Sequence, residues 1–352
     1  MIEFFDDHIQ AVLWIGFILG IAYGMAAQWS RFCLYRGLFN HWQRRESVKL
    51  HAFMLAMAVA LIGSQALQHL LEIDLTQTHY HQRSPSWPLL IGGGILFGYG
   101  MHLSNACGAR SLVLLGSGNL RSLVVLLLLG ISAYVTMSGL LAYPRIDLEA
   151  LTQSRLPSTS IDGLLALTFL SDTAAKLITL AIFAGLLLFF ALKNPTLRRT
   201  PKEWIGGCVI GLLITLSWWV TGYVGADDFE PVRLASFTFV APVGDTLQYA
   251  MLSSGMPLSF AIVLVLGVII GSFIRASIAQ EFKWQGFDSP TQMQRSITGA
   301  ILMGIGGVLS LGCTLGQGVS GFSTLAISSL GALLGILLGA KAGLWIDNNR
   351  KI

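Results

Sequence analysis

The sequence predicts an all-α membrane protein that crosses the bilayer several times. The 352-residue chain is 54% hydrophobic and only 11% charged, a balance that a water-soluble domain of this length does not tolerate. Its apolar residues form long runs, such as LVVLLLLGISAYV and FAIVLVLGVIIGSF. These runs lack the two-residue alternation of a barrel strand, so we expect an all-α polytopic membrane protein.

Each membrane span needs roughly 20 apolar residues. On this basis we expect about nine transmembrane helices, centred near residues 18, 60, 97, 131, 184, 214, 267, 303 and 337. Three apolar stretches, which begin at Ile9, Trp87 and Ile297, run to about 30 residues, too long for one span and too short for two. Each predicts a helix followed by a re-entrant half-helix, because broken backbone at membrane depth is tolerated only inside the protein or beside a cavity.

A cysteine marks each predicted break. Cys33 lies in QWSRFCLYRG, Cys107 in SNACGARS and Cys313 in LGCTLGQG. We expect the glycines of these segments to let the backbone turn, with the thiol at the turn. The start of a half-helix favours anions and makes a thiol more reactive.

Polar side chains accompany these cysteines at helical spacing. Arg36 and Arg110 each follow a cysteine by three residues, so thiol and guanidinium share a face, and arginine is well suited to oxyanions. Gln317 follows Cys313 by four residues. Ser104 and Ser310 precede their cysteines by one turn and are expected as further polar partners. The simpler alternatives are cysteines that only fill space and arginines that reach the membrane interface; the first is our expectation for the fourth cysteine, Cys208.

The chain also contains an internal repeat with an offset of 206 residues. Nine identities fall within 17 positions: Ile91, Gly93, Ile95, Leu96, Gly98, Gly100, Leu103, Ser104 and Cys107 align with Ile297, Gly299, Ile301, Leu302, Gly304, Gly306, Leu309, Ser310 and Cys313. We therefore expect one transmembrane domain over residues 1–352, built from a first repeat at about 9–195 and a second at about 204–346.

Loop charges predict the orientation. Basic residues gather in HWQRRESVK, in KNPTLRRTPK, in the 275–295 loop and at the C-terminus, and such loops stay in the cytoplasm. Nine spans with the N-terminus outside and the C-terminus inside place all four of these basic segments in the cytoplasm. The two repeats are then inverted, an architecture typical of transporters with a central site. The acidic start, MIEFFDDH, does not resemble a cleavable signal peptide.

Several classes of function are not expected. The net charge of +4 is small and scattered, which does not suggest a nucleic-acid partner. The four cysteines match neither a disulfide framework nor a paired zinc motif. The sequence shows no catalytic signature, so we expect no enzyme, no catalytic residues, no metal site and no cofactor. His79 and His81 fall in a predicted outer loop and are expected to be solvated.

Three motifs resemble those of the YeeE/YedE family of sulfur-compound membrane transporters: SRFCLYRG, GGGILFGYGMHLSNACGAR and GAILMGIGGVLSLGCTLGQG. The resemblance covers nearly the whole chain, in length and in motif order. It implies an hourglass of membrane helices with re-entrant helices, and a central path for thiosulfate past Cys33, Cys107 and Cys313. This chain departs from the family at Arg110 and at the residues directly before Cys107 and Cys313, so sulfite, sulfide, a persulfide or a selenium analogue remain alternatives.

We therefore expect a multi-pass transporter of the bacterial inner membrane that takes up a small sulfur-containing anion, most simply thiosulfate. Its partners would be the anion, the lipid bilayer and a candidate small cytoplasmic sulfur-carrier protein. Two alternative functions remain. One is a soft-metal transporter, since thiolates suit copper(I) and zinc. The other is a membrane sulfur-transfer protein that carries a persulfide.

Overall fold

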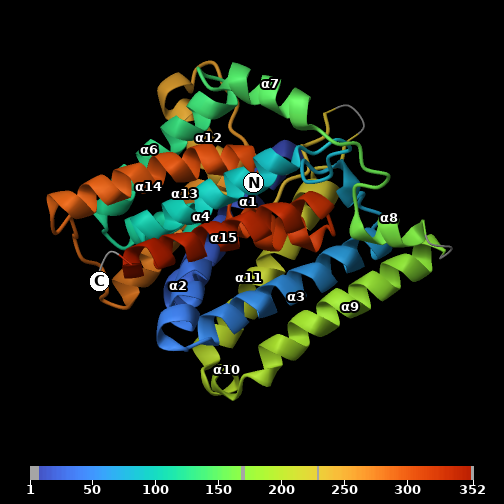
Figure 1. The fold of residues 1–352 in the computed structure, drawn as a ribbon, viewed down its shortest axis with the longest axis horizontal. Coiled ribbons are helices and arrows are strands. Elements are labelled where there is room, and N and C mark those ends of the chain that lie inside the picture. The colour runs from blue at the N-terminus through green and yellow to red at the C-terminus, as the bar shows by residue number, and fades with distance from the viewer. Residues whose placement is uncertain (1–7, 168–170, 228–229, 350–352) are drawn as a thin grey trace, which may run out of the picture.

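The computed structural model describes residues 8–167, 171–227 and 230–349, which form helices joined by loops (Figure 1). The long helices are α1 (His8–Ser30), α3 (Val48–Leu70), α4 (Trp87–Ser104), α6 (Leu120–Met137), α9 (Asp172–Lys193), α11 (Pro201–Trp219), α13 (Phe260–Ile278), α14 (Pro290–Leu309) and α15 (Ile327–Asn349). The shorter helices are α2 (Leu34–Phe39), α5 (Gly108–Gly116), α7 (Ala142–Thr152), α8 (Ile161–Ala166), α10 (Pro195–Arg199) and α12 (Val240–Leu252). Three π-helical turns, η2 (Asn40–Arg44), η4 (Val220–Val224) and η5 (Gly316–Gly321), and one 3₁₀ turn, η3 (Leu75–Gln77), complete the order.

Within these ranges the chain forms no β-strand, and seven helical segments are long and apolar enough to cross a membrane. The predicted all-α polytopic membrane fold is therefore confirmed. The seven segments cover the expected centres except those near residues 97 and 303, which fall on α4 and α14. Glycines and polar residues make these two helices less apolar, since α14 opens with Pro-Thr-Gln-Met-Gln-Arg-Ser. The count of nine spans thus stays a prediction.

The helices pack in long pairs. α4 lies between α14 and α15, α1 runs along α13, and α3 runs along α11 (Figure 1). Glycines form these contacts because they let two backbones approach closely. A Cβ atom on Gly98 would lie 2.1 Å from the Ile336 carbonyl oxygen, and one on Gly24 would lie 2.2 Å from that of Val268. Larger residues at these positions would force the paired helices apart.

The contact between α4 and α14 has a reciprocal pattern. A Cβ atom on Gly93 would lie 2.9 Å from the carbonyl oxygen of Gly306, and one on Gly100 would lie 2.6 Å from that of Gly299. Each of these four glycines thus packs directly against a glycine of the other helix, close to a cysteine-containing break at the end of α4 or α14.

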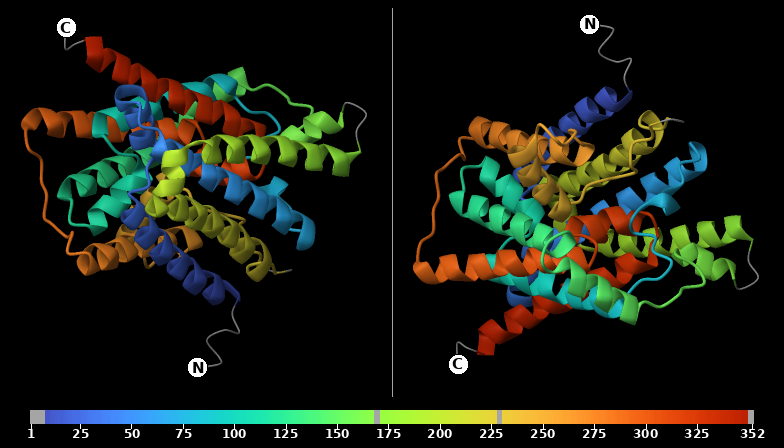
Figure 2. Two further views of the ribbon diagram at one scale, coloured as in Figure 1. Left: turned by 90° about the horizontal axis from the view of Figure 1, so that it is seen from below. Right: turned by 90° about the horizontal axis from the view of Figure 1, so that it is seen from above.

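The outer face of the edge helix α9 is apolar, and the first and last described helices end on opposite sides of the molecule. α9 packs on α3 at the edge of the molecule (Figure 1), and its outer face leaves Leu177, Ile182 and Phe189 more than half exposed. Such a face suits contact with lipid. The first residues of α1 and the last residues of α15 lie at opposite ends of the molecule (Figure 2).

Candidate functional site

The three predicted breaks share one backbone turn. Cys33 lies between α1 and α2, Cys107 between α4 and α5, and Cys313 between α14 and η5. Two residues before each cysteine, the backbone is left-handed, with φ of 50° at Arg31, 57° at Asn105 and 59° at Leu311. The left-handed residue two positions before each cysteine is therefore not a glycine. Gly312, directly before Cys313, also has a positive φ of 157°, so a glycine takes part in the turn at the third break. At the first and second breaks the expectation that glycines make the turn was wrong. A side chain in the left-handed conformation costs about 1–2 kcal/mol, which the surrounding structure must offset.

A serine stabilises each turn from one residue further back. The Ser104 hydroxyl lies 2.9 Å from the carbonyl oxygens of both Gly100 and Ala106. The Ser310 hydroxyl lies 2.7 Å from the Gly306 carbonyl oxygen and 3.1 Å from that of Gly312. Each hydroxyl therefore joins the last turn of the long helix to the residue before the cysteine. Both serines contact the main chain, which leaves them less free to bind a ligand.

The cysteine then starts the next helical segment. The Cys107 carbonyl accepts a hydrogen bond of 2.9 Å from the Ser111 amide, and the Cys313 carbonyl accepts one of 2.8 Å from the Gln317 amide. In addition, the Gly316 amide donates to the Cys313 sulfur at 3.3 Å. The positive end of this short segment thus points at the Cys313 thiol and favours electron-rich groups there.

The three thiols converge inside the protein. Cys33, Cys107 and Cys313 are 7%, 3% and 0% exposed and belong to one buried cluster. The thiols of Cys33 and Cys107 interact with each other, and the Thr314 hydroxyl interacts with Cys107. Because Thr314 directly follows Cys313, this contact brings the third break next to Cys107, and Cys107 lies between the third break and Cys33; we call this arrangement the thiol series.

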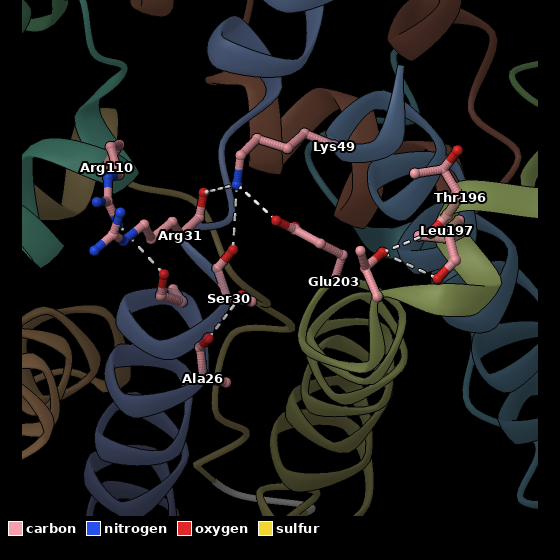
Figure 3. A network of polar contacts seen from close by, with 10 residues as sticks. Ala26, Ser30, Arg31, Lys49, Arg110, Thr196, Leu197 and Glu203 are labelled. Atoms are coloured by element: carbon pink, nitrogen blue, oxygen red, sulfur yellow. Dashed lines mark hydrogen bonds and ion pairs between the residues drawn. The ribbon is translucent and has the colours of Figure 1, made fainter. Parts of the chain in front are cut away.

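The two candidate arginines flank the Cys33 end of this series. Arg110 donates from Nη1 to the Ala27 carbonyl oxygen at 3.3 Å, at the last turn of α1 (Figure 3). Arg36 is exposed, and both guanidinium groups interact electrostatically with Cys33. The C-terminal carbonyls of α1 carry partial negative charge, so Arg110 both caps this helix and places positive charge near two thiols.

Lys49 caps the same C-terminal end of α1. Its ammonium group donates to the Ser30 and Arg31 carbonyl oxygens at 3.4 and 3.3 Å and forms an ion pair with Glu203 at 2.9 Å (Figure 3). Both side chains of the pair are mostly buried, at 17% and 18% exposure. The contact ties the first break to α3 and α11, and so fixes the position of the turn before Cys33.

A cavity of about 880 Å³ opens beside this end of the thiol series. We call it the arginine cavity, because six basic residues line it: Arg31, Arg36, Arg44, Lys49, Arg121 and Arg295. Its two acidic residues are already paired, Glu203 with Lys49 and Asp347 with Arg295. The cavity therefore has an excess of positive charge and attracts anions.

Gln317 is placed differently from the arginines. It is fully buried in η5, and its Nε2 donates to the Ser310 carbonyl oxygen at 2.6 Å. The amide thus bridges the third break. Its Oε1 has no hydrogen-bond partner among the described residues. Gln317 can therefore position the Cys313 turn and still accept one further hydrogen bond.

Several residues of the site escaped the sequence analysis. Tyr23 lies close enough to all three thiols for charges on them to act on it, and its ring centroid lies 5.0 Å from that of Phe237 and 5.5 Å from that of Phe239. Phe239 directly precedes α12, as Cys33 directly precedes α2. The 206-residue offset pairs these two positions and also pairs Ser30 with Ser236, so the repeat could have identified this fourth, thiol-free position.

The expectation that the two loop histidines, His79 and His81, are solvated was wrong. The His81 ring contacts the Thr159 hydroxyl at 3.2 Å and the Thr324 carbonyl oxygen at 3.1 Å. The ring of His79 lies 3.9 Å from that of Tyr80. Burial, followed by the positive charge of Arg233, lowers the pKa of His79 from 6.5 to about 4. Both rings pack the 71–86 loop onto the end of the molecule away from the arginine cavity.

The sequence matches the model of a family described as sulphur transport over residues 29–342. The chain belongs to the sulphur transport family. This confirms the resemblance to YeeE/YedE proteins. Two curated relatives are each 25% identical to it. The thiosulfate transporter TsuA of Escherichia coli aligns over 348 residues, 94% of this chain and 93% of the relative. The thiosulfate transporter TsuA of Spirochaeta thermophila aligns over 349 residues, 95% of this chain and 99% of the relative.

Proposed function

We propose that this chain imports thiosulfate, and that the anion passes Cys313, Cys107 and Cys33 in that order before it enters the arginine cavity. The observation that carries the proposal is the convergence of three buried thiols from three distant breaks. Relatives that match almost the full length of the chain and are named thiosulfate transporters support the choice of substrate.

The chemistry of the thiols suits such an anion. A neutral S–H group is a weak hydrogen-bond donor, so it can contact the terminal sulfur of thiosulfate without holding it tightly. Successive weak sites favour passage, since a transported ion must also leave each site. Arg110 and Arg36 supply positive charge near Cys33, where the anion would otherwise be poorly solvated. Ser104, Ser310 and Gln317 keep the turns in place.

The proposed architecture is two inverted repeats, about 9–195 and 204–346, with nine spans in a bacterial inner membrane. The reciprocal contact of α4 with α14 supports the repeats: Gly93 faces Gly306 and Gly100 faces Gly299, and the 206-residue offset exchanges the two pairs. The excess of arginine and lysine in the cavity supports its assignment to the cytoplasmic side, with the end of α15. The start of α1 is then periplasmic.

Passage without bond cleavage is one part of this proposal, so the protein would not be an enzyme. Transfer of a sulfur atom to one thiol as a persulfide is the alternative, and mass spectrometry of the purified protein after exposure to thiosulfate would detect the added atom. A soft-metal transporter is the other alternative, and the arginines near Cys33 count against a cationic cargo. A small cytoplasmic sulfur-carrier protein could dock at the basic loops around the cavity.

The test is uptake of radiolabelled thiosulfate by cells that lack their own sulfate and thiosulfate importers. We expect Cys33→Ala, Cys107→Ala and Cys313→Ala each to lower the uptake rate by at least about tenfold, equivalent to ~1.4 kcal/mol in the barrier. Cys208→Ala is the matched control, because Cys208 lies on α11 and is only half-buried. It should leave uptake unchanged.

Two results would contradict the proposal in different ways. Wild-type rates in a well-expressed Cys107→Ala or Cys313→Ala protein would exclude the thiol path. No uptake by well-expressed wild type would exclude thiosulfate and direct the search to sulfite, sulfide, persulfide and selenium species.

A further inference from the structure

An anion importer faces an electrical problem. The inside-negative membrane potential opposes the entry of every negative charge, so thiosulfate, with two charges, would be driven outward unless its entry is coupled to another process. This inference rests on the proposed function. It concerns which groups provide the coupling.

A chain of hydrogen bonds runs along the wall of the arginine cavity and starts beside the Cys33 break. Tyr35, two residues after Cys33, lies on α2 with its hydroxyl 3.0 Å from Nδ1 of His102 on α4. Nε2 of His102 lies 2.9 Å from Oδ2 of Asp347 on α15. Asp347 also pairs with Arg295 on α14. Four elements thus meet around one imidazole, and all four residues line the arginine cavity.

The imidazole is held in place from several sides. Tyr35 and His102 are only 2% and 8% exposed. The ring packs directly against Gly343 of α15, where a Cβ atom would lie only 2.6 Å from Cγ of His102. The groups that face His102 are Tyr35, Asp347, Arg295 and Tyr99, whose ring centroid lies 6.5 Å away. Arg36 stands next to Tyr35 along α2.

Both ring nitrogens are engaged in a way that permits proton transfer. A neutral imidazole can accept from the Tyr35 hydroxyl at Nδ1 and donate from Nε2 to the Asp347 carboxylate. When a proton that enters with the anion reaches the Tyr35 oxygen, the Tyr35 hydroxyl proton can move to Nδ1. The Nε2 proton then moves to Asp347, which releases it to water in the cavity. Each group gains one proton and loses one. The relay resets when the Tyr35 hydroxyl rotates about its C–O bond and the His102 ring, without turning, loses its Nδ1 proton and regains one at Nε2 from water in the cavity.

We propose that anion uptake is coupled to proton entry, and that Tyr35, His102 and Asp347 conduct the proton along the wall of the arginine cavity, from its end beside Cys33 to the end of α15. Their hydrogen bonds allow proton transfer, a role assigned neither to the thiols nor to the arginines. Among the described histidines, His102 combines burial at the Cys33 end with hydrogen bonds at both ring nitrogens. A purely structural clamp between α2, α4 and α15 is the competing explanation.

The experiment uses the purified full-length protein in liposomes that contain a pH-sensitive dye, with the membrane potential clamped. Radiolabelled thiosulfate is added outside, and the protons that enter per thiosulfate are measured. We expect the wild-type protein to acidify the lumen as thiosulfate enters. His102→Gln and Tyr35→Phe should lower the number of protons per thiosulfate by at least about tenfold. The control is His69→Gln, an exposed histidine at the far end of α3, which should keep the wild-type ratio.

The outcomes are distinguishable. Wild-type thiosulfate entry without acidification, or entry driven by a sodium gradient alone, would overturn the coupling and leave the proposed function intact. An unchanged proton ratio in His102→Gln would assign the chain a structural role and overturn the inference. If His102→Gln does not fold, Tyr35→Phe and Asp347→Asn decide by the same ratio. No thiosulfate entry in wild type would refute both proposals.

Discussion

Two neighbouring glycines of α4 offer a matched pair of substitutions. Gly93 faces α14, and a Cβ atom there would lie 2.5 Å from Leu309 Cβ, 2.7 Å from the Ser310 nitrogen and 2.9 Å from the Gly306 carbonyl oxygen. Gly92 has no heavy atom within 4 Å of the same position. Alanine at the two sites therefore tests the helix contact with almost no difference in composition.

The expected magnitudes follow from these contacts. Replacing glycine by alanine inside a helix gains about 0.8–1.0 kcal/mol from the backbone alone, so Gly92→Ala should stabilise the protein by up to about 1 kcal/mol. Gly93→Ala gains the same amount but forces α4 and α14 apart. Overpacking of this kind costs about 1–3 kcal/mol, and here it is at the high end because two of the three contacted atoms belong to the backbone. The net loss should be about 1–2 kcal/mol.

The assay is thermal unfolding of the purified protein in detergent, at one scan rate because such unfolding is often irreversible. The midpoint of Gly93→Ala should fall below wild type, and that of Gly92→Ala should equal or exceed it. Uptake by Gly93→Ala should fall as well, since the added methyl displaces Ser310 and with it the turn before Cys313. Equal midpoints for the two variants would refute the close contact between α4 and α14.

Three further predictions concern charge, the turns and pH. Arg36→Gln should raise the KM for thiosulfate by about threefold or more, with a smaller effect at high salt because surface charge is screened. Arg36→Lys keeps the positive charge and should bring the KM back close to the wild-type value. Identical KM values for Arg36→Gln and wild type would exclude a role of Arg36 in attracting the anion. Ser310→Ala should lower the unfolding midpoint by the loss of about 1 kcal/mol of hydrogen bonding, whereas an unchanged midpoint would show that the hydroxyl does not hold the turn. Because the folded pKa of His79 is depressed from 6.5 to about 4, the unfolded state binds more protons in this window, so the stability that His79 contributes should fall as pH drops from 6.5 to 4 and stay constant above 6.5. His79→Gln should therefore make the unfolding midpoint fall less steeply over this pH range than it does in wild type, and an identical slope would refute the prediction.

Much of the site followed from local sequence. A cysteine set in a hydrophobic stretch that is too long for one span marked all three breaks. The three-residue spacing predicted Arg36 near Cys33 and Arg110 near Cys107, whereas the interaction of Arg110 with Cys33 came only from the structure. These features depend on neighbouring residues along one chain segment, and helical geometry fixes their relation. The long apolar runs identified the membrane-spanning helices for the same reason.

What the sequence could not supply depends on partners far along the chain. The Tyr35–His102 hydrogen bond joins residues 67 positions apart, and His102 meets Asp347 after a further 245. His81 looked solvated because nothing in its own loop shows that Thr324 packs against it. The left-handed residues at the breaks were also unexpected, because neither Arg31 nor Leu311 is a residue type that favours this conformation. They end their helices through local backbone hydrogen bonds, from the Phe32 amide to the Ala27 carbonyl at 3.2 Å and from the Gly312 amide to the Gly307 carbonyl at 2.7 Å.

These left-handed residues have a mechanical consequence. The long helices are fastened together by backbone contacts at glycines and cannot bend easily without losing them. Arg31, Asn105 and Leu311 lie two residues before the three thiols. Such backbone conformations persist only where the surrounding structure holds them, so the direction of each thiol is set by the two helical segments that its turn joins. A substitution that relaxes one turn would therefore move a thiol without unpacking the helices on either side.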